Sequence, residues 1–538
     1  MRNGLLRITT LALLGGASLF VQPSTSEAFC GFYVAGAEAP LYNNATQVVL
    51  MRSGETTVIS MQNNYEGPPE NFAMVVPVPV VLEEGDVKTL PADVFAKVDQ
   101  LAAPRLVEYW EQDPCYRPPK RRYRKVRKKK SGMAVPSAAS APGGSVVVHA
   151  RFDVGEYEVV ILGADDSRGL DGWLRQHGYN IPEQAEPALR PYVAEGMKFF
   201  VARVNADKVR FEKGQAKLSP LRFHYDSQDF KLPIRLGMLN AKDKQDLIVH
   251  VLAPGKRYAV ANYENVAVPT NLDVKDRTRK DFPGFYASLF DRTLEKHPGA
   301  IVTEYAWNAG SCDPCPGPTL DGSDLATLGN DVIDAHDSFV LTRLHARYGA
   351  DLSGQDLVFA AGEPIAGGRE WHAEGGVEQG LVKSNVNNFQ ARYAIRHEWK
   401  GKVRCRDPRY GIWGGPPSQS GQVGPVKPKP AQDLAFAPRG RSLAEYMVKP
   451  VSELDGVAAP GALGGERQPY EQMPPAPVPP ASSVGDTAEV ASPPVEPAVD
   501  EPDPGSAGGA GCQGKSQPPV ASLGVLLVLG LRRRKRRG

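Results

Sequence analysis

The sequence predicts an α+β body with a mixed or mostly antiparallel sheet and a few short helices, followed by a disordered Pro-rich stalk. Short β-favouring runs alternate with stretches of helical periodicity from residue 29 to about residue 415. An apolar fraction of 41% and a charged fraction of 23% are ordinary for a globular protein, and 538 residues can bury a sizeable core. From residue 416 to 510, Pro, Ala, Gly and Ser dominate, so this linker lacks the apolar area to fold.

The first predicted elements are a hairpin and a proline-containing strand. Val48–Arg52 and Thr56–Gln62 are β-favouring runs joined through Ser53-Gly54, which is a hairpin signal. Phe72–Val80 is apolar, but its two prolines cannot donate ladder hydrogen bonds. It is therefore expected to be an edge strand or an extended segment.

Three short helices are predicted from apolar residues that recur on one face. The first is Pro91–Ala103, with a proline in its first turn and Pro104 as its stop. The second ends at Gly178, and the third is interrupted by two prolines. The apolar stripes of the second and third helices are Leu170, Trp173 and Leu174, and then Ala185, Leu189, Tyr192 and Val193.

The clearest predicted strand is Phe389–Trp399, in which every second residue is apolar or aromatic. His397 falls on its apolar face, where a hydrogen-bonded core histidine is the expected reading. Other strand-like runs are Val146–Phe152, Tyr157–Leu162, Lys198–Val204, Leu221–Tyr225, Asp246–Leu252 and Tyr258–Asn262.

The N-terminus has the pattern of a secretory signal peptide over residues 1–28. Arg2 and Arg7 supply positive charge, Ile8–Val21 is apolar, and Ser26-Glu27-Ala28 is a small-x-small cleavage site. The apolar run is short for a membrane anchor, so cleavage after Ala28 is favoured over anchoring.

A strongly basic insertion interrupts the body at about residues 117–144. Its run from residue 120 to residue 130 contains nine basic side chains: Lys120, Arg121, Arg122, Arg124, Lys125, Arg127, Lys128, Lys129 and Lys130. Like charges at this density repel and cannot be buried, which predicts a solvated loop. The alternative is contact with a polyanion such as an anionic envelope glycan. Nucleic acid is less well supported, because Tyr123 is the run's one aromatic residue.

The C-terminal tail, residues 511–538, has the order Cys, apolar run, basic cluster. Cys512 precedes the apolar run Val520–Leu531, which ends in Arg532–Arg537. An apolar segment followed by cations behaves as a membrane-directed stop-transfer signal. Twelve residues make roughly 18 Å of helix, which is short against a hydrocarbon core of about 30 Å. A processed sorting signal is therefore favoured over an ordinary C-terminal span.

Cysteine usage fits an oxidising compartment. Apart from Cys512, five cysteines remain, so at least one is free or paired differently: Cys30, Cys115, Cys312, Cys315 and Cys405. A bridge between Cys115 and Cys405 is a structural guess, because each lies in a polar, Pro-containing loop beside a Trp-containing segment.

The Cys312-Asp313-Pro314-Cys315 motif is the best chemical candidate in the sequence. A tight disulfide, or two separate bridges pinning a loop, is the favoured structural reading. A redox-active pair needs a lowered thiol pKa, usually at a helix N-terminus, and Pro316-Gly317-Pro318 opposes an immediate helix. A metal site needs two further ligands, and no second CxxC supplies them by spacing.

Catalytic and cofactor motifs are absent from the sequence. There is no HExxH, no GxSxG elbow, no phosphate-binding loop and no dinucleotide fingerprint, so no cofactor is predicted. The densest titratable group is His336 with Asp334 and Asp337, near His345. An ordinary polar loop is favoured there over a zinc or calcium site.

Several stretches of the body together form a family pattern. They are FCGFYV at residues 29–34, MQNNYEGP at 61–68 and FAMVVPVP at 72–79. The pattern continues in PRLVEYW at 104–110, CDPC at 312–315, LTRLHARY at 341–348 and the region 392–413. In these stretches the body resembles the family called domain of unknown function 2330, which carries no known activity or functional residues. Beside that family, the basic run looks like an insertion of this chain.

The tail is similar to the myxobacterial sorting tail known as MYXO-CTERM. That resemblance implies processing near Cys512 and display on the cell surface. The expected protein is thus an exported envelope protein held by its C-terminus, whose partners are the membrane and the export and tail-processing machinery. A binding or structural module is the leading hypothesis for the body. The alternative is an extracytoplasmic enzyme using the CxxC motif or a His/Asp site.

Overall fold

The computed structural model describes residues 32–34, 42–43, 46–62, 65–66, 73–115, 147–179, 181, 185–212, 215–240, 244–348, 355–369, 378, 380–416, 425–431, 434 and 437–449. All of them lie in the first of two compact units, Met1–Glu471. The predicted signal peptide, the basic run, Ala28, Cys30, Cys512 and the sorting tail lie outside the described residues.

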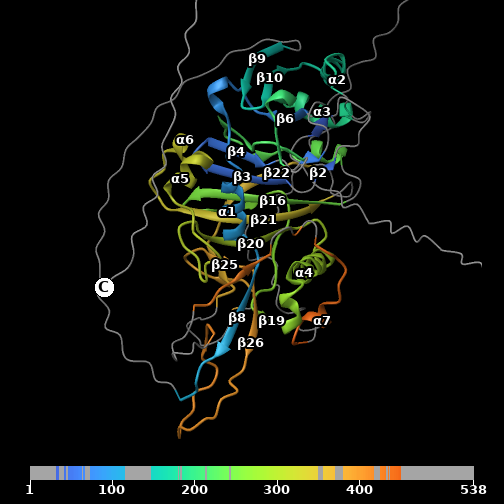
Figure 1. Cartoon of the computed structure of the whole chain (residues 1–538). Helices are drawn as coiled ribbons and strands as arrows, with labels where there is room; N and C mark the ends of the chain where they lie inside the picture. Colours follow the sequence, from blue (N-terminus) through green and yellow to red (C-terminus); the bar gives the residue numbers. More distant parts are fainter. Residues whose placement is uncertain are drawn as a thin grey trace, which may run out of the picture. The chain divides into compact units, whose positions relative to one another are not determined.

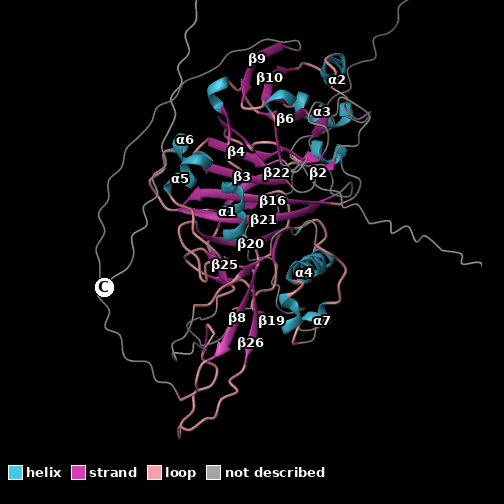
Figure 2. Ribbon diagram, viewed as in Figure 1, coloured by secondary structure: helices cyan, strands magenta, loops and turns pink. Residues whose placement is uncertain are grey.

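The predicted fold class is confirmed, because several mixed or antiparallel sheets dominate and the helices are few and mostly short (Figures 1 and 2). The helices are α1 (Asp93–Ala102), α2 (Ser167–Gln176), α3 (Ala185–Ala194), α4 (Phe282–Lys296), α5 (Gly322–Leu325), α6 (Asp331–Ile333) and α7 (Leu443–Tyr446).

The largest sheet forms the middle of the body and mixes parallel with antiparallel pairs. Its order is β24 (Val382–Lys383), β23 (Ile365–Gly367), β25 (Asn388–Gln390), β20 (Ile301–Asn308), β21 (Phe339–Tyr348), β16 (Gln245–Pro254), β3 (Thr46–Ser53), β4 (Thr56–Gln62), β14 (Leu221–Asp226) and β7 (Val87–Thr89), with β18 (Asn265–Ala267) beside β20. Strands β3 and β4 are the predicted hairpin, and Gly54 in its turn has a φ of 57°, which glycine adopts without a Cβ penalty.

A second, antiparallel sheet packs against the first. Its order is β1 (Phe32–Val34), β6 (Ala73–Val78), β11 (Lys198–Val204), β10 (Tyr157–Gly163) and β9 (Val147–Val154). Successive side chains of β3 point to opposite faces of the largest sheet. Val48 and Leu50 pack against the second sheet, whereas Val49 and Met51 pack against α1. Helices α2 and α3 cover the outer face of the second sheet.

A third sheet forms a finger that extends from the body at the bottom of Figure 1. It contains β19 (Leu272–Asp273), β26 (Arg392–His397), β8 (Arg105–Glu111), β27 (Trp413–Gly414) and β28 (Lys429–Pro430). Smaller sheets are β15 (Lys231–Leu232), β22 (Leu357–Gly362) and β17 (Arg257–Val260), and the pairs β2 (Tyr42–Asn43) with β5 (Tyr65–Glu66) and β12 (Arg210–Glu212) with β13 (Gln215–Lys217).

Three expectations drawn from proline and periodicity are corrected. Strand β6 is not an edge strand, because it lies between β1 and β11. Strand β1 pairs only with Ala73–Val75, so Pro77 has a neighbouring strand, β11, on one side only, and proline is tolerated there. Helix α3 is continuous despite Pro187 and Pro191; Pro187 sits in the first turn, where no intrahelical N–H bond is lost. The predicted strand Phe389–Trp399 divides into β25 and β26, which belong to different sheets.

The body also extends beyond residue 415, where the sequence predicts linker. Residues 425–431, 434 and 437–449 lie against the finger and α4. Their buried residues are Ala431, Leu434, Leu443, Tyr446 and Met447. The linker prediction is therefore wrong for this segment, because its few apolar residues are spaced to pack against α4. Helix α7 (Leu443–Tyr446) lies in this segment.

Candidate functional site

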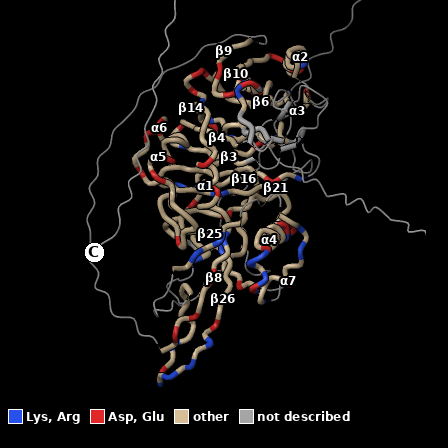
Figure 3. The backbone as a smooth tube through the Cα atoms, in the orientation of Figure 1, with Lys and Arg blue, Asp and Glu red and all other residues tan. Residues whose placement is uncertain are grey.

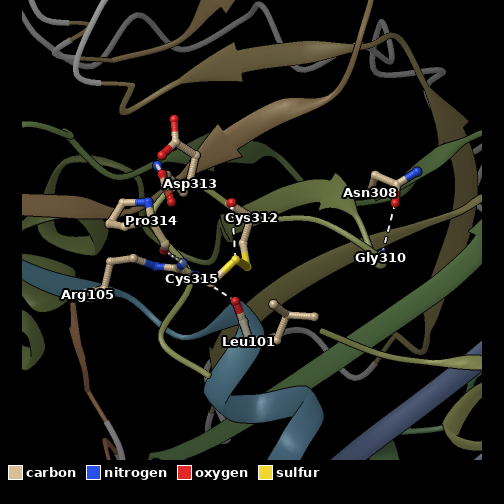
Figure 4. The surroundings of a disulfide bond; sticks show 9 residues. Leu101, Arg105, Asn308, Gly310, Cys312, Asp313, Pro314 and Cys315 are labelled. Atoms are coloured by element: carbon tan, nitrogen blue, oxygen red, sulfur yellow. Dashed lines mark hydrogen bonds between the residues drawn. A yellow bond between two sulfur atoms is a disulfide. The ribbon is translucent and has the colours of Figure 1, made fainter. Parts of the chain in front are cut away.

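The Cys312–Cys315 motif forms a disulfide in a loop that follows β20 (Figure 4). Cys315 is exposed and Cys312 is partly buried. The next helix, α5, does not begin until Gly322, so no helix N-terminus lies directly after Cys315. The tight disulfide expected from the sequence is confirmed, as is the absence of an immediate helix after the motif.

Two buried side chains hold this loop from beneath. The Arg105 guanidinium donates hydrogen bonds to the Pro314 carbonyl at 3.0 Å and to the Leu101 carbonyl at 2.5 Å. The Gln390 amide donates to the Asp313 carbonyl at 2.6 Å. Burial lowers the pKa of Arg105, although the Tyr305 ring beneath its guanidinium counters this effect. The loop backbone is thus fixed, although Cys315 is an exposed residue.

The second disulfide joins Cys115 to Cys405, across 290 residues of sequence. It links the end of β8 to the loop between β26 and β27, with a Cα–Cα distance of 5.5 Å. The pairing expected from the sequence is confirmed. These two bridges use four of the six cysteines.

A network of charged side chains lies buried in the largest sheet. Glu304 accepts hydrogen bonds from Arg343 Nε at 2.6 Å, His345 Nδ1 at 2.7 Å and the Tyr286 hydroxyl at 2.6 Å. The other ring nitrogen of His345 lies 3.0 Å from Asp246 Oδ1. Arg343 also pairs with Asp99 of α1, and its Nη1 lies 3.1 Å from the ring of His250. Glu304 and Arg343 are at most 1% exposed.

The network fixes the charge of its members. Burial alone would lower the pKa of His345, but Glu304 and Asp246 outweigh it and raise that pKa above its usual value. Burial alone would raise the pKa of Glu304, yet His345 and Arg343 lower it to about 2. His250 is the exception, because burial and the adjacent Arg343 push its pKa well down. Both ring nitrogens of His345 face carboxylate oxygens, a geometry that favours its imidazolium form, whereas the lowered pKa of His250 favours its neutral form.

Sequence reasoning missed this network. The sequence does contain a signal for it, which can be recognised once the structure is known. Arg343 and His345 are two residues apart in a strand, so their side chains point to the same face. Asp246 and His250 share a face of the neighbouring strand in the same way. Paired charges inside strand runs that are otherwise apolar would have indicated a buried ionic cluster.

The histidine group singled out in the sequence does not assemble. His336 lies on an exposed loop with Asp334 and Asp337, whereas His345 is buried in the network. Within the described ranges, no three His, Cys, Asp or Glu side chains are grouped as metal ligands would be. His397 is hydrogen-bonded as expected, to Glu108 at 3.1 Å, but it is only partly buried, because it stacks on Trp110 near the surface.

Two cavities in the described body are lined by other residues. One, of about 120 Å³, lies beside β6 and β15 and is lined in part by Glu195, Lys231 and Asp356. The other, of about 380 Å³, is an open groove between α4 and residues 440–444. Neither is lined by a His or a Cys. Nor do the described helices include one that is long and apolar enough to cross a bilayer.

Comparison with family models matches residues 24–360 to a family described as an uncharacterized protein conserved in bacteria, DUF2330. The match includes both the Cys312–Cys315 loop and the buried network, and it ends before the region 392–413. Comparison with curated proteins and with solved structures finds no match. Since the matched residues make up more than half of the chain, this protein belongs to the DUF2330 family of bacterial proteins.

Proposed function

We propose that the protein is an exported bacterial envelope protein whose disulfide-braced body serves as a binding or structural module. The observation that carries this proposal is the pair of disulfides, one of which joins residues 290 apart. Disulfides form and persist in oxidising compartments and are rare in the bacterial cytoplasm.

The two chain ends support export and anchoring. Residues 1–28 have the order of a signal peptide with a cleavage site at Ala28. Residues 511–538 have the order of the MYXO-CTERM tail, with Cys512 before the apolar run and the arginines. The export machinery and the tail-processing machinery are then partners, and the body is held at the membrane or the outer surface.

The buried network favours a structural over a catalytic role for its residues. Glu304, His345 and Arg343 are each paired and sealed from solvent. A general acid or base must reach a substrate, and neither described cavity is lined by these side chains.

The basic run supplies a binding hypothesis. Lys120–Lys130 carries nine positive charges, which suit an anionic envelope glycan through salt-dependent attraction. Replacing the nine basic residues with Ser should lower binding to such a glycan. Unchanged binding would remove the run from the proposal.

The location is tested by adding protease to intact cells that express the full chain. The body should be cut while a cytoplasmic marker protein stays whole, and thiol alkylation before lysis should leave Cys115 and Cys405 unlabelled. A Cys512→Ser variant should lose tail processing and keep the same disulfides. A full-length chain in the cytosol with reduced thiols would overturn the proposal.

A second candidate function is thiol–disulfide exchange at Cys312–Cys315, favoured by the exposure of Cys315. A thiolate of a substrate dithiol would attack Cys315 Sγ, and Cys312 would leave as a thiolate. The second substrate thiolate would then attack the substrate sulfur of the mixed disulfide and release Cys315. The substrate becomes a disulfide, and its two electrons and two protons end on Cys312 and Cys315.

This exchange is tested with a reduced peptide that contains two cysteines. The full chain should oxidise one equivalent of peptide, a Cys312→Ser/Cys315→Ser variant should oxidise none, and a Cys115→Ser/Cys405→Ser variant should retain the activity. If the peptide stays reduced beside the wild-type chain, Cys312–Cys315 is a structural bridge only.

A further inference from the structure

The finger ends in the loop between β26 and β27, residues 398–412, which we call the finger tip. Lys400, Lys402, Arg404, Arg406 and Arg409 lie in it and are all exposed. Glu398 and Asp407 are its acidic residues, so the finger tip has five positive charges and two negative charges, a net charge of +3. Figure 3 shows Lys and Arg gathered at the far end of the finger.

These cations differ from the basic side chains nearer the body, which have acidic partners. Arg396 Nε lies 2.7 Å from Asp273, and Arg279 Nε lies 2.6 Å from Glu108. Among the described residues, no ion pair involves the five basic side chains of the finger tip. The five side chains are exposed, and their positive charge has no ion-pair partner among the described residues.

The backbone of the finger tip is fixed despite this charge. The Cys115–Cys405 disulfide holds its middle, and the Arg409 N–H donates to the Pro114 carbonyl at 2.9 Å. The two oxygens of Glu111 accept from the N–H groups of Trp399 at 3.0 Å and Gly411 at 2.7 Å. Like charges held together repel, so the fold maintains a cationic surface that an unbraced loop would relax by spreading.

Apolar side chains lie among these charges. Tyr410 is 59% exposed, Ile412 45% and Val403 38%. They are three of the seven large hydrophobic side chains that are exposed in the described part of the chain, so the finger tip concentrates such groups. An aromatic face and aliphatic groups beside cations suit a ligand with both anionic groups and C–H surfaces, which is the chemistry of an acidic sugar polymer.

We infer that the finger tip is a binding surface for an anionic polysaccharide, which it contacts through Lys400, Lys402, Arg404, Arg406 and Arg409. This inference rests on the proposed envelope location and deepens it by naming a described surface for the same ligand class. A polymer with one negative charge per sugar can meet several of the five cations at once and displace their counterions. A bilayer is less well matched, because the finger tip offers three exposed large hydrophobic side chains and no further exposed large apolar group among its residues.

The Cys115–Cys405 disulfide relates this surface to the basic run of the sequence. Lys120 follows Cys115 by five residues, and five residues of chain span at most about 18 Å. The two sets of positive charges therefore start from the same covalent junction. Each can be removed without the other, so their contributions can be measured separately.

The test measures binding of the full-length chain in detergent to immobilised polygalacturonate over a range of salt concentrations. In the first variant, Lys400, Lys402, Arg404, Arg406 and Arg409 are all replaced by Gln. Its matched control replaces five exposed basic residues elsewhere by Gln: Arg151, Arg168, Arg203, Lys256 and Lys280. A third variant has the basic run Lys120–Lys130 changed to Ser, and a milder one is Lys400→Gln/Lys402→Gln.

The finger-tip variant should bind roughly tenfold or more weakly at low salt, with a shallower salt dependence, while the control variant binds as the wild type. The milder variant should fall between them, and all should unfold at the wild-type temperature. Equal losses in the finger-tip and control variants, or no loss in the finger-tip variant, would overturn the inference. So would wild-type binding to phosphatidylglycerol vesicles but not to the polymer. Loss in the basic-run variant alone would keep the proposed glycan contact and reject the finger tip.

Discussion

The two disulfides of the body differ in the length of chain that they close. Cys115–Cys405 spans 290 residues, and Cys312–Cys315 spans three. In the loop-closure model the long bridge removes about 5–6 kcal/mol of unfolded-state freedom, and the short bridge about 2 kcal/mol. By that measure the first bridge contributes more stability than the second, which lies at the exposed residue Cys315.

The two disulfides also differ in their surroundings, because one lies in a solvent-exposed loop and the other lies over buried polar side chains. Cys115–Cys405 fixes a loop whose side chains face solvent, and the charge of that loop is the feature that the bridge preserves. The Cys312–Cys315 loop instead lies over buried polar groups, where Arg105 and Gln390 hold its carbonyls. Since Arg105 also bonds the last turn of α1, and Asp99 of α1 pairs with Arg343, the short bridge is supported by the buried network.

The largest expected effect comes from removing the long bridge. Cys115→Ser/Cys405→Ser should lower the free energy of unfolding by about 5 kcal/mol, because the unfolded chain regains the freedom of a 290-residue loop. The matched variant Cys312→Ser/Cys315→Ser should lose about 2 kcal/mol. Denaturant unfolding of both variants measures the difference. Equal losses would show that loop length does not govern the comparison.

The next effect tests the support beneath the short bridge. Glu304→Gln should cost roughly 3–5 kcal/mol, because it leaves the buried charges of Arg343 and His345 without their shared carboxylate. The matched control is Glu264→Gln, which removes the carboxylate 3.0 Å from His297 at the surface and should cost less than about 1 kcal/mol. Similar costs would mean that the buried network adds no more than a surface pair.

The same network predicts a stability optimum in pH. The pKa of Glu304 is lowered from 4.5 to about 2, so its stabilisation is present above pH 4.5 and is lost as the pH falls toward 2. The pKa of His345 is raised above 6.5, so its stabilisation is complete below pH 6.5 and is lost as the pH rises through the higher folded value.

Unfolding midpoints measured from pH 2 to pH 10 should therefore be highest between about pH 4.5 and pH 6.5 for this contribution. Glu304→Gln should flatten both sides of the peak, and Glu264→Gln should leave the profile unchanged. A profile that Glu304→Gln does not alter would contradict the assigned charges.

Much of the sheet could be predicted from the sequence, because period-two runs and turn residues are local signals. The hairpin β3–β4, helix α1 and the tight Cys312–Cys315 bridge are of this kind. The Cys115–Cys405 pairing was a structural guess, because no local signal joins residues 290 apart. The position of β6 was not predictable, because whether a strand has one neighbour or two depends on distant chain. Likewise, Gln390 and Arg392 alternate with apolar residues as if exposed, yet both are 1% exposed because further layers cover them. A buried charge is recognised in a sequence only when its partners are known, and those lie on other strands.

The smallest expected effect comes from replacing one glutamine beside each disulfide by leucine. Gln390 Nε2 donates to the Asp313 carbonyl at 2.6 Å and the Gly368 carbonyl at 3.2 Å, beneath the short bridge. Gln112 Nε2 donates to the Trp110 carbonyl at 2.7 Å and the Gly415 carbonyl at 3.2 Å, beside the long one. Each Gln→Leu change keeps a similar size and removes two bonds to carbonyls, at a cost of roughly 1 kcal/mol.

Gln390→Leu should speed the reduction of Cys312–Cys315 by dithiothreitol several-fold, because a loosened loop exposes the disulfide more often, and should leave Cys115–Cys405 unchanged. Gln112→Leu should do the reverse. Alkylation at timed intervals, followed by mass spectrometry of the four cysteines, measures both rates in one sample. If both substitutions speed the same bridge, then the two sites open together, and the body does not hold its long and short disulfides independently.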